Sequence, residues 1–198
     1  MSPTSATPLP RLNVIIASTR PGRVGPRLAE WFVKIAEEYG RFDVTVVDLA
    51  ELQLPFFNEP KHPSLQDYSH DHTRQWSALT ASADAVVLVL PEYNHGFTAP
   101  LKNAIDYLHK EWYYKPVGFV SYGGIAAGTR AVQMLKPVLV GLRMFPVNAA
   151  VNINLQTGLS SDGEVVAPGA TEAAAALLAE LTRLSDALAP LRRELAAA

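Results

Sequence analysis

The stretch Ala85–Leu90, with the sequence AVVLVL, is apolar at every position. A strand with one face in water alternates polar and apolar residues, so an unbroken apolar run indicates a strand that is buried on both faces. Such strands are typical of parallel sheets that carry helices above and below. The polar residues Pro91-Glu92-Tyr93-Asn94 follow directly. The stretch therefore predicts a central parallel strand with a polar loop at its carboxyl end.

Short β-branched runs alternate with helical repeats on both sides of this stretch. Further strands are expected at Leu12–Ala17, Val44–Val47, Val117–Val120 and Phe145–Val151. Apolar spacing predicts helices that begin at Pro26 and Pro100, and others over Thr73–Ser82, Thr129–Leu142 and Thr171–Leu195. Pro137 is expected to kink or divide the helix over Thr129–Leu142.

This alternation predicts an α/β fold with one doubly wound parallel sheet and helices on both faces. Two strand orders compete, a six-stranded dinucleotide-binding order and the five-stranded flavodoxin-like order 2-1-3-4-5. The presence of five predicted strands favours the flavodoxin-like order. In both, a ligand binds at the carboxyl ends of the strands, where the strand order reverses between the first and third.

The composition limits the class of protein. The 198 residues include no cysteine, which excludes disulfides, thiolate zinc sites and iron–sulfur clusters. The net charge of −2 gives no overall electrostatic basis for binding nucleic acid or an anionic membrane. No apolar run approaches the roughly 18 residues of a spanning helix. We expect residues 1–10, rich in Ser, Thr and Pro, to form a disordered tail, and residues 11–198 to form a single cytoplasmic domain.

The segment Leu52–His72 contains three prolines and shows little periodicity. We expect it to run over the surface and to serve function or contact with a partner, because long loops in small domains are seldom idle. His70 and His72 flank Asp71 in this segment. Their i,i+2 spacing, without further acids, is a weak metal motif, and we predict no metal site.

The segment Ser18–Pro26 joins the first strand to the first helix. A helix N-terminus offers free N–H groups and a positive dipole end, which attract phosphate. The segment adds two hydroxyls, two charges and two glycines, from Ser18, Thr19, Arg20, Gly22, Arg23 and Gly25. It is neither a Walker A loop nor a dinucleotide fingerprint, and Asp48 is interpreted as the end of the second strand. A single phosphate is therefore expected here.

Two more loops are expected at the same edge of the sheet. Pro91–Thr98 combines an aromatic ring with amide and carboxylate neighbours, which suits stacking on a flat heterocycle and recognition of its edge. Ser121-Tyr122-Gly123-Gly124 brings glycines that let backbone amides face a ligand. Together with the phosphate loop, these features predict a planar cofactor with one phosphate tail, for which flavin mononucleotide (FMN) is the obvious candidate.

Three motifs resemble those of the NADPH-dependent FMN reductase family. They are Ser18-Thr19-Arg20, Pro91-Glu92-Tyr93-Asn94 with Leu101-Lys102-Asn103-Ala104-Ile105-Asp106, and Ser121-Tyr122-Gly123-Gly124. The resemblance covers about Leu12 to Val151 and implies a flavodoxin-like fold, FMN as cofactor, NADPH or NADH as donor, and a homodimer or homotetramer. This chain departs from the family at Ala17, where Gly is usual, and at Arg23 and Gly25, where Ser and Asn are frequent.

The resemblance also implies site residues. The FMN phosphate would be held by Ser18, Thr19 and Arg20 with the amides of Arg23, Val24 and Gly25. The isoalloxazine would be lined by Pro91, Glu92, Tyr93 and Asn94. Another edge of the ring would face Ser121, Gly123 and Gly124. Tyr93, His95, Phe97 and Tyr122 are expected to frame the flavin edge without a convergent charged pair. The interface candidate is the helix after Pro100 with the Leu52–His72 segment. Lys102 and Asp106 can pair on that helix or across a subunit boundary.

These residues predict an FMN-dependent NAD(P)H oxidoreductase that works by a ping-pong scheme. Hydride transfer to a flavin needs stacking and orientation, so no catalytic acid or base is assigned. Quinones, azo compounds, metal oxyanions and free flavin are all expected acceptors, because apolar walls select weakly. The alternative is a flavodoxin-like electron carrier without its own reductase activity, against which the modest net charge of −2 argues.

Overall fold

The computed structural model describes residues 8–197. Most of the expected tail therefore lies outside the described residues. Within that tail, the carbonyl of Pro10 accepts a hydrogen bond of 2.9 Å from the Asp43 amide. The domain boundary proposed at residue 11 thus follows a segment that already contacts the sheet.

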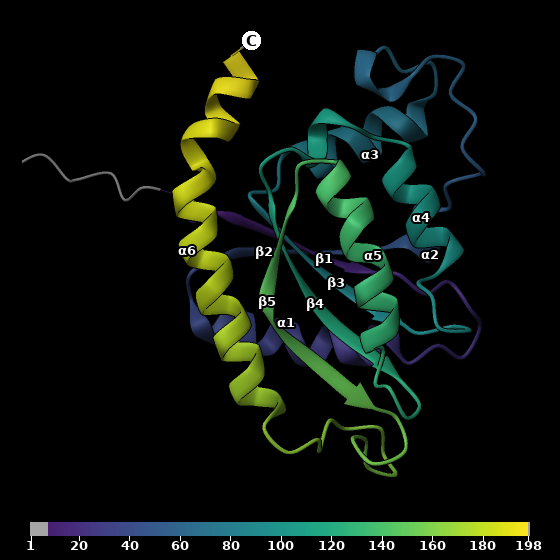
Figure 1. The fold of residues 1–198 in the computed structure, drawn as a ribbon, viewed down its shortest axis with the longest axis vertical. Helices are drawn as coiled ribbons and strands as arrows, with labels where there is room; N and C mark the ends of the chain where they lie inside the picture. The colour runs from purple at the N-terminus through teal and green to yellow at the C-terminus, as the bar shows by residue number, and fades with distance from the viewer. Residues whose placement is uncertain (1–7, 198) are drawn as a thin grey trace, which may run out of the picture.

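The sheet has five parallel strands in the order β2-β1-β3-β4-β5 (Figure 1). The predicted flavodoxin-like order is therefore confirmed. The strands are β1 (Arg11–Ile16), β2 (Asp43–Asp48), β3 (Ala85–Pro91), β4 (Pro116–Gly123) and β5 (Phe145–Asn154). Every residue of β3 is buried, as its apolar run predicts. The reversal of strand order lies between β1 and β3, whose carboxyl ends meet at one edge.

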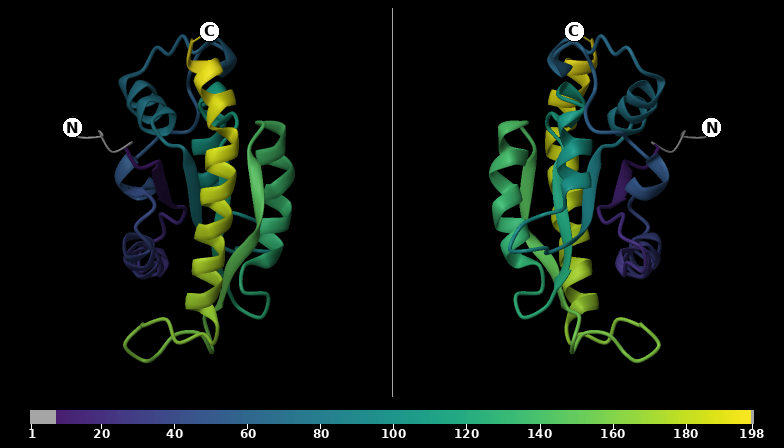
Figure 2. Two further views of the ribbon diagram at one scale, coloured as in Figure 1. Left: turned by 90° about the vertical axis from the view of Figure 1, so that its left-hand side faces the viewer. Right: turned by 90° about the vertical axis from the view of Figure 1, so that its right-hand side faces the viewer.

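Helices cover both faces of the sheet, and Figure 1 shows α6 and α5 on opposite sides of β5. One core cluster joins the sheet to α1 (Gly25–Tyr39) and α6 (Ala170–Ala197). The other joins it to α2 (Leu49–Leu52), α3 (Asp71–Ala81), α4 (Ala99–Asp106) and α5 (Thr129–Gly141). Two 3₁₀ turns, η1 (Pro63–Leu65) and η2 (Lys110–Trp112), complete the described elements. The connection after β5 projects beyond the sheet in Figure 2.

The helix predicted over Thr129–Leu142 is present as α5, from Thr129 to Gly141. Of the two effects expected of Pro137, a kink or a division, the division is wrong. Proline removes the hydrogen bond to the carbonyl four residues earlier, which belongs to Gln133. Pro137 and Gln133 are both exposed, so water can hydrogen-bond that carbonyl and the helix continues. The strand β5 also continues to Asn154 instead of ending at Val151, since β4 extends far enough for Gly123 to pair with Asn154.

The segment 52–72 crosses the surface as expected, and side chains hold it in place. The Asn103 side chain of α4 donates to the Pro55 carbonyl (2.7 Å) and accepts from the Phe57 amide (2.9 Å). Glu59 is buried, and its carboxylate accepts from the amides of Ser69 and His70. The Asn103 side chain therefore fixes the start of this segment, and the Glu59 carboxylate fixes its end.

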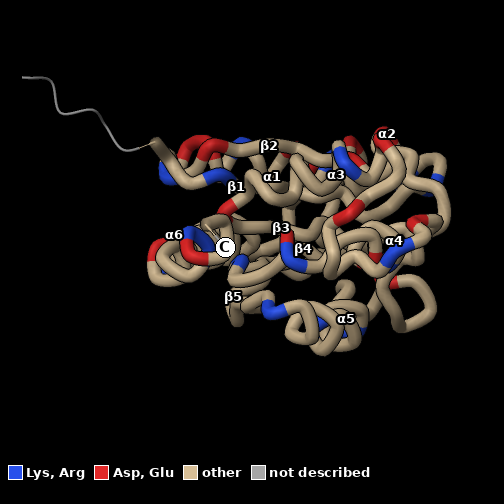
Figure 3. The backbone as a smooth tube through the Cα atoms, turned by 90° about the horizontal axis from the view of Figure 1, so that it is seen from above, with Lys and Arg blue, Asp and Glu red and all other residues tan. Residues whose placement is uncertain are grey.

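Charged positions are interspersed around the helices and loops in Figure 3. On α4, Lys102 Nζ lies 2.6 Å from Asp106 Oδ2, so the expected i,i+4 pair forms within the chain. No helix among residues 8–197 is long and apolar enough to cross a membrane.

Candidate functional site

Three loops meet at the carboxyl edge of the sheet, as the topology predicts. The Ser18 and Tyr93 hydroxyl oxygens are 2.9 Å apart, which joins the β1–α1 loop to the β3–α4 loop. Thr98 Oγ1 donates to the Ala17 carbonyl (2.8 Å), and the Glu92 amide donates to the Tyr122 carbonyl (2.9 Å). The structure therefore brings the three loops together at one place.

The helix α1 begins without a side-chain cap, because its N-cap residue is Val24. Its first turn contains no acidic residue and has Pro26 near its start. The positive end of the helix dipole therefore faces the loop 18–24. Pro26 has no N–H and the Arg27 amide donates to the Val24 carbonyl at 3.1 Å, so Gly25 brings the N–H of this turn that a ligand could use. Arg20 and Thr19 are exposed in this loop, whereas Ser18 is buried.

Arg23 binds within the chain. Its Nη1 and Nη2 donate to the two Asp48 carboxylate oxygens at 2.5 and 2.6 Å, and Nη1 also donates to the Ser18 carbonyl at 2.7 Å. The hydrogen bond to Asp48 raises the Arg23 pKa further above its ordinary value. Asp48 ends β2 and caps α2, since it accepts from the Ala50 amide. The Arg23 guanidinium thus fixes the loop to β2 instead of pointing a free charge at a ligand, whereas Arg20 in the same loop is exposed.

Tyr122 does not frame the outer edge of the site as predicted. Its side chain is only 3% exposed and belongs to the core cluster under α1. Successive side chains of a strand point to opposite faces, so Ser121 and Tyr122 cannot face one ligand together. The Ser121 hydroxyl is also buried, within 2.8 Å of both the Ala127 carbonyl and Asn152 Oδ1. In the β4–α5 loop, Gly124 is exposed with open space around it.

A tight turn presents Tyr93 at the surface. The backbone groups of Tyr93 and Gly96 hydrogen-bond to each other in both directions, at 3.0 and 2.9 Å. Between them, Asn94 and His95 have φ of 50° and 69°. Positive φ at both central residues is the geometry of a type I′ turn, in which asparagine is favoured. Tyr93 is 39% exposed, so its ring is available to a ligand.

The site also contains a charged pair that the sequence analysis missed. Arg130, in the first turn of α5, donates from Nε to Glu92 Oε1 at 2.6 Å and from its amide to Glu92 Oε2 at 3.2 Å. Its Nη1 donates to His95 Nε2 at 2.9 Å. The expectation of no convergent charged pair is therefore wrong. Arg130 lies in the first turn of a helix and not in a loop after a strand, and this place at the start of α5 is the sequence signal that marks it.

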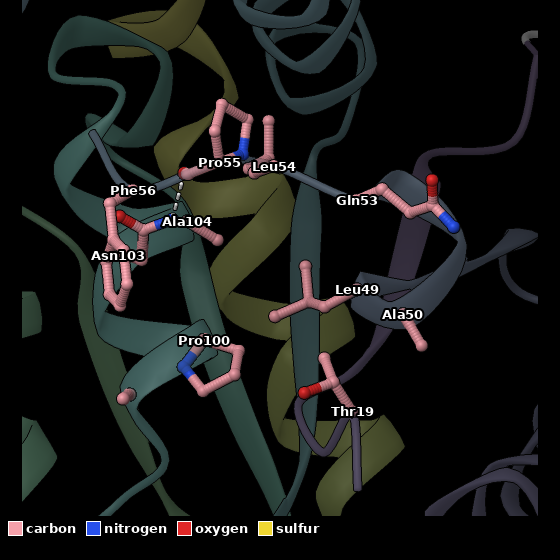
Figure 4. Close-up of a pocket in the computed structure, with 11 residues that line it drawn as sticks. Thr19, Leu49, Ala50, Gln53, Leu54, Pro55, Phe56, Pro100, Asn103 and Ala104 are labelled. Atoms are coloured by element: carbon pink, nitrogen blue, oxygen red, sulfur yellow. Dashed lines mark hydrogen bonds between the residues drawn. The ribbon is translucent and has the colours of Figure 1, made fainter. Parts of the chain in front are cut away.

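A cleft of about 510 Å³ opens beside the phosphate loop (Figure 4). Thr19 lies at one side, α2 and the residues after it form a second wall, and the start of α4 forms a third. Most of the lining is apolar, and it comprises Thr19, Leu49, Ala50, Gln53, Leu54, Pro55, Phe56, Ala99, Pro100, Asn103 and Ala104. The segment after β2 was expected to have a role, but its place in this cleft depends on tertiary packing.

His70 and His72 do not lie within a larger set of ligands. Their rings stack with centroids 5.0 Å apart. Among residues 8–197, no three His, Asp or Glu side chains gather as a metal site.

A doubly wound sheet of order 2-1-3-4-5, with an uncapped helix start at its switch point, defines the flavodoxin-like class of nucleotide-binding folds. Residues 10–158 match the model of the NADPH-dependent FMN reductase family, and the chain belongs to that family. The predicted oxidoreductase class and the cofactors FMN and NADPH or NADH are thereby confirmed.

Individual relatives agree with this assignment. The chain is 40% identical over 137 residues to an NAD(P)H-dependent FMN reductase of Schizosaccharomyces pombe, covering 68% of each chain. It is 35% identical over 145 residues to the NAD(P)H-dependent FMN reductase LOT6 of Saccharomyces cerevisiae, covering 68% of this chain and 75% of LOT6. The fold is similar to that of FerB, an NAD(P)H:(acceptor) oxidoreductase from Paracoccus denitrificans, with a TM-score of 0.67 and 21% identity over 92% of this chain and 98% of FerB.

Proposed function

We propose that the chain is a two-step reductase that takes a hydride from NADPH or NADH and passes the electrons to a loosely specified small-molecule acceptor. Bound FMN would supply the ring on which the hydride is held between the two steps. The observation that carries the proposal is the meeting of three loops at the uncapped start of α1, where Ser18 and Tyr93 hydroxyls lie 2.9 Å apart. The residues of the chain need only bind and orient.

The phosphate loop has the groups that a phosphate monoester requires. The first-turn amides of α1 have no side-chain cap, and the exposed Arg20 adds a positive charge. The Ser18 hydroxyl would exchange its contact with Tyr93 for one with a phosphate oxygen. Thr19 lies at the border between this loop and the cleft. The Arg23–Asp48 pair would hold the loop in the required shape.

The second loop and the β4–α5 loop would hold the ring. The turn at Asn94 fixes the exposed Tyr93 ring, which suits stacking on a flat heterocycle. Gly124 leaves its backbone accessible, so its amide would reach a ring edge. Glu92 is 7% exposed at its side chain and is bound to Arg130, so it would orient Arg130 instead of contacting the ring directly.

The cleft supports a broad choice of acceptor. Its walls include Leu49, Leu54 and Pro100, and apolar walls distinguish substrates by only about 1–3 kcal/mol per methylene. Arg130 is 41% exposed at its side chain and is paired with Glu92, so its guanidinium would hydrogen-bond a polar group of the donor or acceptor without adding net charge to the site. Quinones, azo compounds, metal oxyanions and free flavin all remain within this proposal.

The proposal includes a homodimer or homotetramer in the cytoplasm, with residues 11–198 as one FMN-binding domain. Phe56 and Leu65 on the segment beside α4 are 87% and 65% exposed, which suits contact with a second copy. Size-exclusion chromatography with light scattering tests this part, and a monomer at micromolar concentration would contradict it.

Steady-state kinetics tests the function. The protein, loaded with FMN, should oxidise NADPH in the presence of a benzoquinone, an azo dye, chromate or free FMN. Double-reciprocal plots should be parallel, because donor and acceptor use the same flavin face in turn. Intersecting lines with every acceptor would refute the shared face. If the protein binds FMN but does not oxidise NADPH with any of these acceptors, it is an electron carrier instead. A protein without flavin absorbance after FMN addition would contradict both functions.

A further inference from the structure

The Tyr122 hydroxyl is a buried polar group without a hydrogen-bond partner among residues 8–197. Two other buried hydroxyls share this property, those of Thr73 and Thr80, and both lie on α3 away from the phosphate loop. Buried polar groups in folded proteins are usually paired, because an unpaired one loses its hydration without compensation. The position of Tyr122 therefore requires an explanation.

The Tyr122 side chain reaches from β4 to the start of α1. A Cβ atom placed on Gly25 would lie 3.0 Å from the Tyr122 hydroxyl oxygen and 3.0 Å from Ile16 Cγ2. Contacts this short are tighter than most that real Cβ atoms make, so a glycine at the first position of α1 is what leaves room for the hydroxyl. The hydroxyl thus lies directly beneath the first turn of α1.

The surroundings of this hydroxyl favour an anion. Ser18 and the Gly25 amide adjoin it, and both carry hydrogen-bond donors that an anion can accept from. Arg23 is also nearby, but its charge is balanced by Asp48. Burial, with the neighbouring Tyr93, raises the Tyr122 pKa far above its ordinary value, so the phenol keeps its proton. A protonated phenol can donate one hydrogen bond, and the uncapped N–H groups of α1 offer no acceptor for it.

We propose that the Tyr122 hydroxyl, which occupies the space that Gly25 leaves open, donates a hydrogen bond to the FMN phosphate from beneath the loop 18–25. This inference rests on the proposed function and deepens it. It moves Tyr122 from the isoalloxazine edge to the phosphate, and it makes a strand that is not adjacent to β1 part of the phosphate site. Gly25 would then serve by its lack of a side chain.

The test compares Tyr122→Phe with the unchanged protein by titrating FMN and riboflavin into flavin-free protein and following flavin fluorescence. Loss of a hydrogen bond to a charged group should weaken FMN binding about 10-fold or more and leave riboflavin binding within about 2-fold. Tyr113→Phe is the matched control, because the Tyr113 hydroxyl bonds to His109 at 3.0 Å and lies outside the three loops. Its affinity for both flavins should not change.

Unfolding of the flavin-free proteins supplies a second readout. Tyr122→Phe removes an unpaired hydroxyl, so its midpoint in urea should equal or exceed that of the unchanged protein. A midpoint that falls together with the affinities for FMN and riboflavin would show that the hydroxyl serves the fold alone. A hydroxyl satisfied by a buried water would give equal losses, or none, for the two flavins. Each of these results would overturn the inference.

Gly25→Ala tests the same contact without altering Tyr122. Its Cβ should displace the hydroxyl and weaken FMN binding in the unchanged background by about 10-fold, but much less in the Tyr122→Phe background. Additive effects of the two changes would overturn the inference. Failure of the proposed function is distinguishable, because the unchanged protein would then bind FMN and riboflavin equally or bind neither. Such a result would refute the phosphate site at the loop 18–25 itself, whatever the affinities of the variants.

Discussion

The two ends of the sheet use buried polar groups in different ways. At the amino end, Lys115 is 3% exposed and its Nζ donates to the carbonyls of Thr80 and Ala81 at the end of α3. Glu111 accepts from Tyr68, Ser77 and the His109 amide. At the carboxyl end, the Tyr122 hydroxyl has no partner among the described residues and α1 has no side-chain cap. The paired groups of the amino end stabilise the fold, although the buried Thr80 hydroxyl beside Lys115 also has no partner among the described residues. The unpaired hydroxyl of the carboxyl end lies at a helix start, which is where a ligand can bind.

The largest effect is expected at the amino end, from Glu111→Ala. In the unchanged protein the Glu111 carboxylate accepts from the Tyr68 hydroxyl at 2.7 Å, the Ser77 hydroxyl at 2.6 Å and the His109 amide at 3.1 Å. The change leaves these three donors without their acceptor. We expect a loss of about 3 kcal/mol in the free energy of unfolding, measured in urea. FMN affinity should stay unchanged. Glu30→Ala, which removes an exposed carboxylate on α1, is the control and should cost about 0.5 kcal/mol or less.

Arg20→Ala should have the opposite profile. Loss of a charge-assisted hydrogen bond to phosphate costs about 1.5–3 kcal/mol, or roughly 10- to 100-fold in FMN affinity. The free energy of unfolding without flavin should change by less than about 0.5 kcal/mol, because Arg20 is exposed. Arg41→Ala removes an exposed charge after α1 and serves as the control. Unchanged FMN affinity in Arg20→Ala would mean that backbone amides suffice.

The pH dependence of stability should reveal Lys115. Burial, and secondly Arg192, lower the Lys115 pKa from 10.5 to about 7, against the opposing effects of Asp84 and Glu111. Between pH 7 and 10 the unfolded chain keeps a proton that the folded chain lacks, so this group makes stability rise with pH. The slope is at most about 1.4 kcal/mol per pH unit. Lys115→Met should lose this slope between pH 7 and 9 in urea unfolding, and identical slopes would contradict the assignment.

The smallest effect is expected from a pair that is formed but exposed. Lys102 and Asp106 are 2.6 Å apart, yet their side chains are 43% and 41% exposed. Water and salt screen such pairs, so Lys102→Ala should cost about 0.5 kcal/mol or less in free energy of unfolding. A loss above about 1 kcal/mol would show that pairing stabilises this protein even without burial, and the contrast between the two ends would then need revision.

The strands were predictable because their signals are local, and their order followed because five strands favour the flavodoxin-like order over the six-stranded alternative. The apolar run Ala85–Leu90 reports burial on both faces, and no tertiary contact is needed to recognise it. The absence of a division at Pro137 was not predictable, because the sequence does not reveal which carbonyl faces water. A proline whose lost hydrogen bond belongs to an exposed residue such as Gln133 does not end a helix.

The three loops of the site were also predictable, because parallel strands end at one edge. The directions of their side chains were not. Tyr122 and Ser121 alternate across β4, and which of them faces α1 depends on register. Arg23 has a partner in Asp48, 25 residues later, and Arg130 has one in Glu92, 38 residues earlier. Contacts at such separations arise only after the chain has packed.

The glycine at position 118 has a consequence for the synthesis of the chain. A Cβ there would lie 2.5 Å from the side chain of Leu177, so α6 packs directly against the backbone of β4. The side chains of Leu177, Leu178 and Leu181 fill one of the two core clusters. At about 5–20 residues per second, the 28 residues of α6 take roughly 1–6 s to be made. During those seconds the strands already exist, and the part of this face that α6 covers beside α1 is still bare, so the nascent chain is exposed to aggregation and to chaperones until α6 packs.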